Sequence, residues 1–110
     1  MDMSNPASWK GVYPATVLPL GSDLEIDESD LRGLLRWLMS VEGISGLTCN
    51  GHAGDAWSLS RNEQRRVTEI HVAEADGRLP VLSGISGSAT ADYIEAMRDA
   101  RDAGADAVLV

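Results

Sequence analysis

A helix that ends at a glycine and leads into a short apolar strand occurs three times in this chain, and this repeat constrains the fold most strongly. The glycines are Gly43, Gly77 and Gly104, and the apolar segments after them are residues 44–49, 81–85 and 107–110. Glycine after a helix adopts the left-handed backbone that ends the helix at low cost. Strands that alternate with helices form βαβ units, so the sequence predicts an α/β fold with a parallel sheet and right-handed crossovers.

A further apolar segment near the N-terminus predicts a strand ahead of these three. It comprises Val12–Leu18, and the chain then enters an acidic stretch. The first helix is expected from about Asp27 to Val41, because its leucines recur at the spacing of one helical face. These leucines are Leu31, Leu34, Leu35 and Leu38. Four strands and three helices are compatible with an open sheet or with part of a barrel, and periodicity does not separate the two.

The second and third helices carry their own start signals. Ser60 and Glu63 form a capping-box pattern, which predicts a helix start at Ser60. The third helix is expected to start near Ser88 or Thr90, either of which could cap it, and to end at Gly104. The residues expected on the inner faces are Val67 and Ile70 in the second helix, and Ile94 and Met97 in the third.

Length and composition predict one modest globular core. The chain has 110 residues, of which 44% are hydrophobic, and we expect an N-terminal extension, residues 1–10, before a single folded portion, residues 11–110. A net charge of −8 argues against a nucleic-acid partner, since phosphate binding needs clustered Lys and Arg. We find no metal-site pattern, because the carboxylates near the first helix have irregular spacing and fit a solvated acidic turn. They are Asp23, Glu25, Asp27, Glu28 and Asp30.

The cysteine content and the apolar runs bear on location. The single cysteine, Cys49, excludes an intramolecular disulfide and reads as a small core residue rather than a nucleophile. The first ten residues do not resemble a signal peptide, and no apolar run reaches the roughly 20 residues that span a bilayer. The expectation is a cytoplasmic protein without a membrane partner.

The glycine-punctuated loop after the second predicted strand is the candidate functional site. It reads Asn50-Gly51-His52-Ala53-Gly54-Asp55. Gly51 and Gly54 allow a ligand to approach the backbone closely, and α/β folds place their chemistry on loops that follow parallel strands. An imidazole both donates and accepts protons near neutrality, so His52 is a candidate general acid or base. The alternative for His52 is packing and hydrogen bonding to backbone.

Other residues carry weaker signals. His71 lies within the second helix beside charged neighbours and is expected to be structural or solvent-facing. Trp57 could close over a ligand, although packing is the more common role of a tryptophan at such a place. Three serines at the end of the third predicted strand could line a pocket, although a helix cap is the more common role for at least one of them. They are Ser83, Ser86 and Ser88.

Taken together, these motifs closely resemble the dihydrodipicolinate synthase / N-acetylneuraminate lyase family from Gly11 onward. The segments that carry the resemblance are 11–20, Asp27 with Leu31, 43–47, 50–55, Leu59-Ser60 with Glu63, 77–81 and 103–106. The resemblance implies a TIM (β/α)₈ barrel whose members bind pyruvate or another 2-keto acid as a Schiff base on a lysine. They then act as lyases, aldolases or dehydratases, with no cofactor, in the cytoplasm, and as homo-oligomers, with a tetramer expected for the full-length protein.

In such a barrel this chain would supply the N-terminal half, strands 1–4, truncated at the fourth. The family's tyrosine and Schiff-base lysine are expected beyond Val110, and the only lysine here, Lys10, lies before the first strand. The chain alone is therefore expected to lack the nucleophile and to be inactive.

The loop departs from the family pattern in a way that bears on the substrate. Where the synthases have Gly-Thr-Thr-Gly-Glu, this chain has Gly51-His52-Ala53-Gly54-Asp55. The resemblance implies that Gly51, His52 and Ala53 bind the substrate, with the backbone N–H groups of His52 and Ala53 on its carboxylate. Two hydroxyls are lost, one of them part of a proton relay, so we predict a relative of the synthases that acts on another 2-keto acid.

Two non-enzymatic alternatives stay open. The first is a non-catalytic half-barrel that self-associates or binds a partner through unpaired sheet edges. The second is a nucleotide- or phosphate-binding α/β domain, for which no Gly-x-Gly-x-x-Gly fingerprint follows the first predicted strand.

Overall fold

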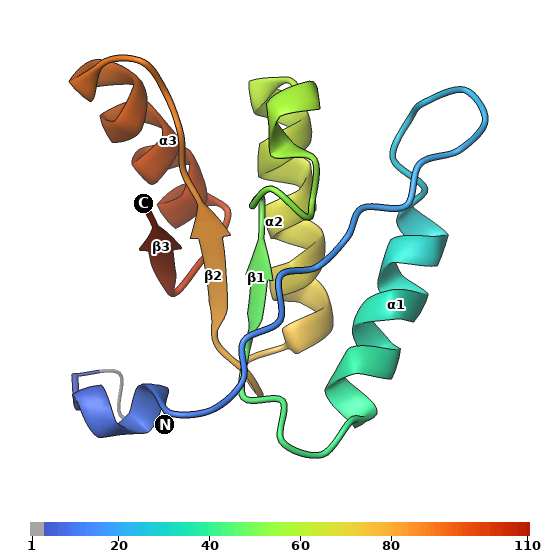
Figure 1. Ribbon diagram of the computed structural model, residues 1–110, viewed down its shortest axis with the longest axis vertical. Coiled ribbons are helices and arrows are strands. Elements are labelled where there is room, and N and C mark those ends of the chain that lie inside the picture. Colours follow the sequence, from blue (N-terminus) through green and yellow to red (C-terminus); the bar gives the residue numbers. More distant parts are fainter. Residues whose placement is uncertain (1–3) are drawn as a thin grey trace.

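The structure, a computed structural model, describes residues 4–110 and alternates helices with parallel strands (Figure 1). The elements are η1 (Pro6–Trp9), α1 (Glu28–Ser40), β1 (Leu47–Cys49), η2 (Ala56–Ser58), α2 (Arg61–Ala75), β2 (Val81–Gly84), α3 (Thr90–Asp102) and β3 (Ala107–Leu109). The three strands form a parallel sheet in the order β1-β2-β3. The predicted α/β fold is confirmed, with each strand shorter than its apolar segment. None of the helices in residues 4–110 is long and apolar enough to cross a membrane.

The segment predicted as the first strand, Val12–Leu18, lies beside β1 without forming a regular strand. Two isolated parallel bridges join Val12 to Ile44 and Ala15 to Thr48. The N–H of Thr16 donates to the carbonyl of Thr48 at 2.9 Å. Pro14 supplies a carbonyl but no N–H, which interrupts a continuous ladder. The prediction is right about the place of the segment and wrong about its regularity.

Helices α1 and α2 begin within one residue of their predicted starts, and each has a side-chain cap. Asp27 accepts a hydrogen bond from the N–H of Asp30 at 3.0 Å and caps α1. Ser60 and Glu63 form the capping box of α2, with distances of 3.1 and 2.9 Å between the paired groups. The glycines that follow the helices have positive φ values, of 94° at Gly43, 74° at Gly77 and 100° at Gly104, as a helix-ending glycine requires.

Helix α3 departs from the prediction at both its cap and its inner face. Ala89 occupies the cap position, and the carboxylate of Asp92 accepts the N–H groups of Ser88 and Ala89, each at 3.0 Å. Neither Ser88 nor Thr90 caps the helix. The predicted burial of Ile94 and Met97 is wrong: they are 42% and 44% exposed, because α3 turns small alanines towards the sheet. The buried alanines are Ala100 and Ala103.

The core fills the space between the sheet and the first two helices. One cluster comprises Leu31, Leu35, Leu47 and Ile70, and a second comprises Cys49, Val67, Ala75 and Val81. Leu18 and Ile26 pack against both clusters, so the N-terminal segment belongs to the same core. The predicted inner face of the second helix is confirmed, because Val67 and Ile70 are both buried.

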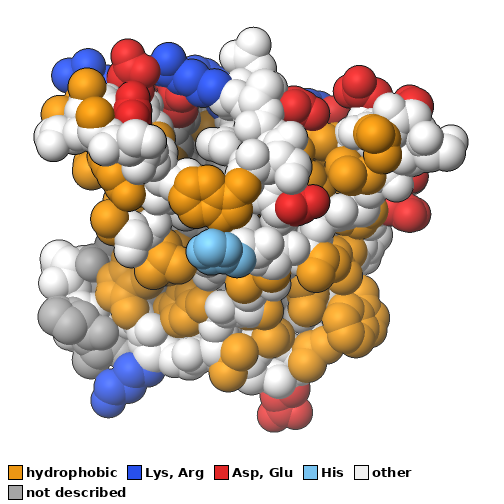
Figure 2. Space-filling model, turned by 45° about the horizontal axis from the view of Figure 1, so that its top comes forward, with side chains coloured by type: hydrophobic (Ala, Val, Ile, Leu, Met, Phe, Trp, Pro, Cys, Tyr) orange, Lys and Arg blue, Asp and Glu red, His pale blue; other side chains and the backbone are white. Residues whose placement is uncertain are grey.

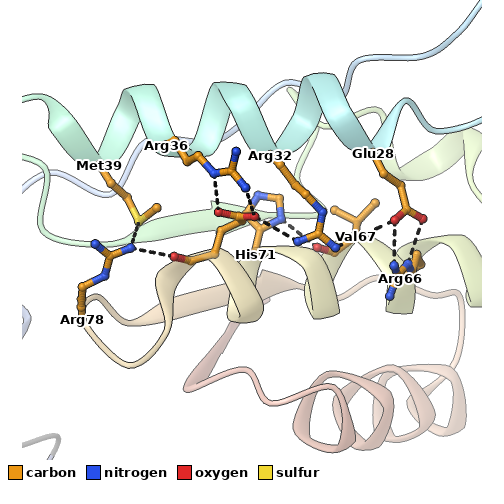
Figure 3. Close-up of polar contacts among 9 residues, drawn as sticks. Glu28, Arg32, Arg36, Met39, Arg66, Val67, His71 and Arg78 are labelled. Atoms are coloured by element: carbon orange, nitrogen blue, oxygen red, sulfur yellow. Dashed lines mark hydrogen bonds and ion pairs between the residues drawn. The ribbon is translucent and has the colours of Figure 1, made fainter.

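Ion pairs join α1 to α2 along the outer side of this core (Figure 3). Glu74 binds Arg36 and Arg32, each at 3.0 Å, and the guanidinium groups lower the pKa of Glu74. Glu28 binds Arg66 at 2.7 Å, and this hydrogen bond lowers the pKa of Glu28. These ion pairs hold α1 against α2.

Candidate functional site

The glycine loop leaves β1 at its carboxyl end and packs tightly against neighbouring backbone. Asn50 has a left-handed backbone with φ of 57°, so the chain turns sharply as the strand ends. A Cβ on Gly84 would lie 2.2 Å from the carbonyl oxygen of Asn50, and one on Gly54 would lie 3.1 Å from that of Thr16. Glycine at residues 84 and 54 therefore lets β2 and the Thr16 segment approach the loop closely.

Both ends of the loop are hydrogen-bonded to α2 through one residue. The side-chain amide of Asn50 donates to the backbone carbonyl of Gln64 at 2.9 Å. The side-chain amide of Gln64 donates to the carbonyl of Ala56 at 2.8 Å. Asn50 also donates to the hydroxyl of Thr68 at 2.9 Å. These buried and partly buried hydrogen bonds hold the start of the loop and the residue that follows its end against α2.

The backbone N–H groups of His52 and Ala53 are available to a ligand. Within residues 4–110 neither group has an intramolecular acceptor, whereas the N–H of Asp55 donates to the carbonyl of His52 at 3.0 Å. Successive unpaired N–H groups in a turn favour the binding of an anion. The loop therefore has two successive backbone donors of the kind that binds anions.

A cavity of about 240 Å³, which we call the loop cavity, lies beside these groups. Its lining residues are Asn50, Gly51, His52, Trp57, Gly84, Ile85, Ser86, Tyr93, Leu109 and Val110. Gly51 and His52 line it as expected, and Ala53 lies in the adjoining exposed turn instead. Figure 2 shows a face of the molecule on which hydrophobic side chains gather around a histidine side chain.

His52 and Trp57 lie against one another at this cavity. The indole N–H of Trp57 donates to Nδ1 of His52 at 3.3 Å, and the ring centroids are 5.6 Å apart. Trp57 is 64% exposed, so it is not a core residue. Trp57 therefore lines the loop cavity in contact with His52 rather than packing in the core.

A second cavity, of about 270 Å³, lies between α2 and α3, and we call it the helix cavity. Arg61 spans it and hydrogen-bonds to Asp99 and to Glu95, the latter at 3.3 Å. The hydrogen bond from Arg61 lowers the pKa of Asp99. Ser83 lines the helix cavity, Ser86 lines both cavities, and Ser88 lines neither.

The remaining predicted candidates have structural roles. His71 is fully buried; its ring nitrogens lie 2.8 Å from the hydroxyl of Thr16 and 2.8 Å from the carbonyl of Val67. Burial lowers the pKa of His71 to about 4. Burial raises the pKa of the Cys49 thiol, which keeps it protonated and makes it a poor nucleophile.

The acidic residues near α1 bind different partners and do not converge on one site. Asp23 accepts the N–H of Glu25 at 3.0 Å, Asp27 caps α1, and Glu28 binds Arg66. Asp23, Asp27 and Glu28 thus each have a separate partner, and no two of them share one.

Several lining residues were not named as site candidates from the sequence, among them Asn50, Ile85 and Tyr93. Asn50 lines both cavities, while Ile85 and Tyr93 line the loop cavity. Tyr93 stands in the first turn of α3, just after the loop that follows β2. A signal was present, because the first turn of a helix after a parallel strand lies near the carboxyl end of the sheet.

Comparisons with known proteins agree with this arrangement. Residues 8–110 match the model of the dihydrodipicolinate synthetase family. The 4-hydroxy-tetrahydrodipicolinate synthase of Bradyrhizobium diazoefficiens is 38% identical over 98% of this chain and 36% of its own length. That of Rhizobium meliloti is 39% identical over 93% of this chain and 34% of its own length. The chain spans about a third of the length of the curated relatives that it matches.

Solved structures give the same result for the fold. A dihydrodipicolinate synthase crystal structure superposes with a TM-score of 0.85 at 36% identity, over 91% of this chain and 34% of that one. The Aquifex aeolicus dihydrodipicolinate synthase gives a TM-score of 0.85 at 27% identity, over 93% and 34%. These neighbours are TIM barrels, so the chain forms part of such a barrel, and the part is nearer a third of their length than the half that we expected. The chain belongs to the dihydrodipicolinate synthetase family.

Proposed function

We propose that the whole protein binds pyruvate or another 2-keto acid as a Schiff base and acts as a lyase, aldolase or dehydratase. The observation that carries this proposal is a pair of unpaired N–H groups, one on His52, which lines the loop cavity, and one on Ala53 in the adjoining turn. No Asp or Glu side chain lines that cavity among the described residues, which favours an anionic ligand. Family membership supports the same chemistry, in which a strand-borne lysine supplies the nucleophile.

We further propose that the substrate differs from that of the dihydrodipicolinate synthases. The support is His52-Ala53 in place of the Thr-Thr of the synthase pattern, which removes two hydroxyls from the loop. Loss of one hydrogen bond to a charged carboxylate costs roughly 1.5–3 kcal/mol. In this proposal, His52 takes over as general acid or base, or as a hydrogen-bond donor to the substrate.

Two experiments on the whole protein test these proposals. Incubation with pyruvate and borohydride is expected to give one reduced adduct on a lysine, located by mass spectrometry; absence of an adduct with any 2-keto acid would overturn the Schiff base. The second experiment compares the unmodified protein with the double variant His52→Thr/Ala53→Thr in the condensation of pyruvate with aspartate semialdehyde. We expect the higher kcat/KM from the double variant. A higher value from the unmodified protein would identify it as a dihydrodipicolinate synthase.

A second candidate function is a non-catalytic part-barrel that associates through its sheet edge. The observation that favours it is that β3 pairs only with β2 among the described residues, while Leu109 and Val110 are 53% and 85% exposed. Light scattering distinguishes the two: concentration-dependent association of the 110-residue chain supports the second candidate. A homo-oligomeric state of the whole protein, a cytoplasmic location and a domain boundary at residue 10 stay predictions.

A further inference from the structure

The contact between Trp57 and His52 is more specific than packing. The indole and imidazole rings are tilted by 50°, with the indole N–H directed at Nδ1 of His52. Trp57 is 64% exposed and gains little from removal of apolar surface from water. The hydrogen bond to His52 is therefore the distinctive interaction that this side chain makes.

The chemistry of the two rings determines where the imidazole carries its proton. An indole N–H donates and cannot accept, and a neutral imidazole has one donor nitrogen and one acceptor nitrogen. Because Nδ1 of His52 accepts from Trp57, Nε2 must carry the hydrogen in the neutral ring. The opposite tautomer would set two N–H donors against each other.

The backbone between the two residues holds the pair together. Asp55 adopts a left-handed conformation, with φ of 56° and ψ of 34°, and its N–H donates to the carbonyl of His52 at 3.0 Å. The hydroxyl of Ser58 donates to the carboxylate of Asp55 at 3.2 Å. This turn leads into η2, which carries Trp57 back over His52. The pairing is thus a consequence of the loop fold.

We propose that Trp57 is a positioning residue, which holds His52 in the Nε2–H tautomer so that the ring presents an N–H donor to an oxygen of a ligand in the loop cavity. The ligand class is a carboxylate or a keto oxygen, since both accept hydrogen bonds. This inference rests on the proposed function for the identity of the ligand. The tautomer itself is a property of the unliganded protein, which separates the two in an experiment.

Nuclear magnetic resonance of the 15N-labelled chain measures the tautomer directly, at mildly alkaline pH and without ligand. We expect His52 to show one protonated and one unprotonated ring nitrogen, assigned as Nε2 and Nδ1. Trp57→Phe keeps an aromatic ring and removes the donor, and we expect the two tautomers to become mixed. The matched control is Trp37→Phe, which removes another exposed tryptophan, 62% exposed on α1, and should leave the His52 ring signals unchanged.

The reciprocal variant His52→Ala removes the acceptor instead of the donor. It therefore tests the same hydrogen bond through a second substitution. We expect it to shift the indole N–H resonance of Trp57 and to leave that of Trp37 in place. Unchanged ring signals in Trp57→Phe, or an unchanged indole signal in His52→Ala, would overturn the inference.

Ligand binding completes the test in the whole protein. Trp57→Phe is expected to weaken the binding of pyruvate by about three- to tenfold, the loss of one well-placed neutral hydrogen bond, while Trp37→Phe leaves the affinity unchanged. Equal affinities for Trp57→Phe and the unmodified protein would overturn the positioning role. If the unmodified protein binds no 2-keto acid, the proposed function fails, and the ring signals still decide whether Trp57 sets the tautomer.

Discussion

The hydroxyl of Thr16 donates a hydrogen bond to Nε2 of His71 at 2.8 Å, inside the core. The direction follows from the other ring nitrogen: Nδ1 lies 2.8 Å from the carbonyl of Val67, which can only accept, so Nδ1 carries the hydrogen. The bond ties the N-terminal segment to α2 across the sequence. The carbonyl of Thr16 also lies close to Gly54, so the segment that binds His71 packs against the glycine loop as well.

Burial of His71 predicts a stability that falls with acid. The pKa of His71 is lowered from 6.5 to about 4, so the unfolded chain binds a proton that the folded chain excludes between these values. The free energy of unfolding should be constant above about pH 7 and fall by about 3 kcal/mol on the way down to pH 4. Urea unfolding across this range measures it. His71→Gln should flatten the dependence, whereas His52→Gln, at the exposed histidine, should retain it.

Removal of the Thr16 hydroxyl tests the same bond from the other side. Thr16→Val conserves the shape of the side chain and leaves Nε2 of His71 without a donor, which is expected to cost about 1–3 kcal/mol of unfolding free energy. Thr90→Val, at an exposed position in the first turn of α3, controls for the loss of a threonine hydroxyl. Equal stability losses in the two variants would argue against the buried bond.

The ion pairs between α1 and α2 should differ in strength. The side chain of Glu74 is 11% exposed and binds two arginines, whereas that of Glu28 is 41% exposed. Glu74→Gln is expected to cost about 1 kcal/mol, and Glu28→Gln less. Because the pKa of Glu74 is lowered, its contribution should be present above its unfolded pKa, near 4.5, and be lost as the pH falls further. Chemical unfolding of both variants, at low and high salt, measures the two losses of unfolding free energy. A larger loss for Glu28→Gln than for Glu74→Gln would contradict the prediction.

Two glycines should respond to alanine in opposite directions. At Gly84 the new Cβ would meet the carbonyl oxygen of Asn50 at 2.2 Å, so Gly84→Ala is expected to destabilise the chain by about 1–3 kcal/mol or more. At Gly33, inside α1, a Cβ meets nothing within 4 Å, and Gly33→Ala should stabilise by about 0.5–1 kcal/mol. Thermal unfolding of both variants makes the comparison; a stable Gly84→Ala would mean that β2 and the loop are less closely packed.

The 110-residue chain itself should form no Schiff base with pyruvate. Its only lysine, Lys10, is exposed and precedes the segment beside β1, away from the loop cavity. Treatment with pyruvate and borohydride, followed by mass spectrometry, is expected to leave the mass unchanged. A stoichiometric adduct on Lys10 would be contrary evidence, and the whole protein, treated in parallel, is the positive control.

Helix starts could be predicted from the sequence because they depend on residues that are adjacent in the chain. Ser60 caps α2 as its capping-box pattern predicted, because a cap needs only its own first turn. Ile94 and Met97 form an apolar stripe, but a stripe does not say which packing surface faces it, and both are exposed. Periodicity likewise could not show that His71, beside charged neighbours, lies inside the core.

The position of the glycine loop was predicted for a similar reason. The position of the loop after a parallel strand follows from topology, so Gly51 and His52 were expected at the cavity and lie there. The pairing of His52 with Trp57 depends on the left-handed turn at Asp55, which no periodic pattern announces. Tyr93 reaches the same cavity from a different βα unit, and only the assembled sheet brings it close.

Gln64 holds the glycine loop at both ends, through Asn50 and Ala56, and this makes loop and helix one mechanical unit. A rigid-body displacement of α2 carries the ligand-facing backbone with it, and the loop has little freedom to lag behind. We therefore expect a substitution that shifts α2, for example at the ion pair of Glu74 and Arg36, to shift the glycine loop as well. The substitutions that the loop tolerates are therefore expected to depend on its hydrogen bonds to α2 as well as on its contacts with a ligand.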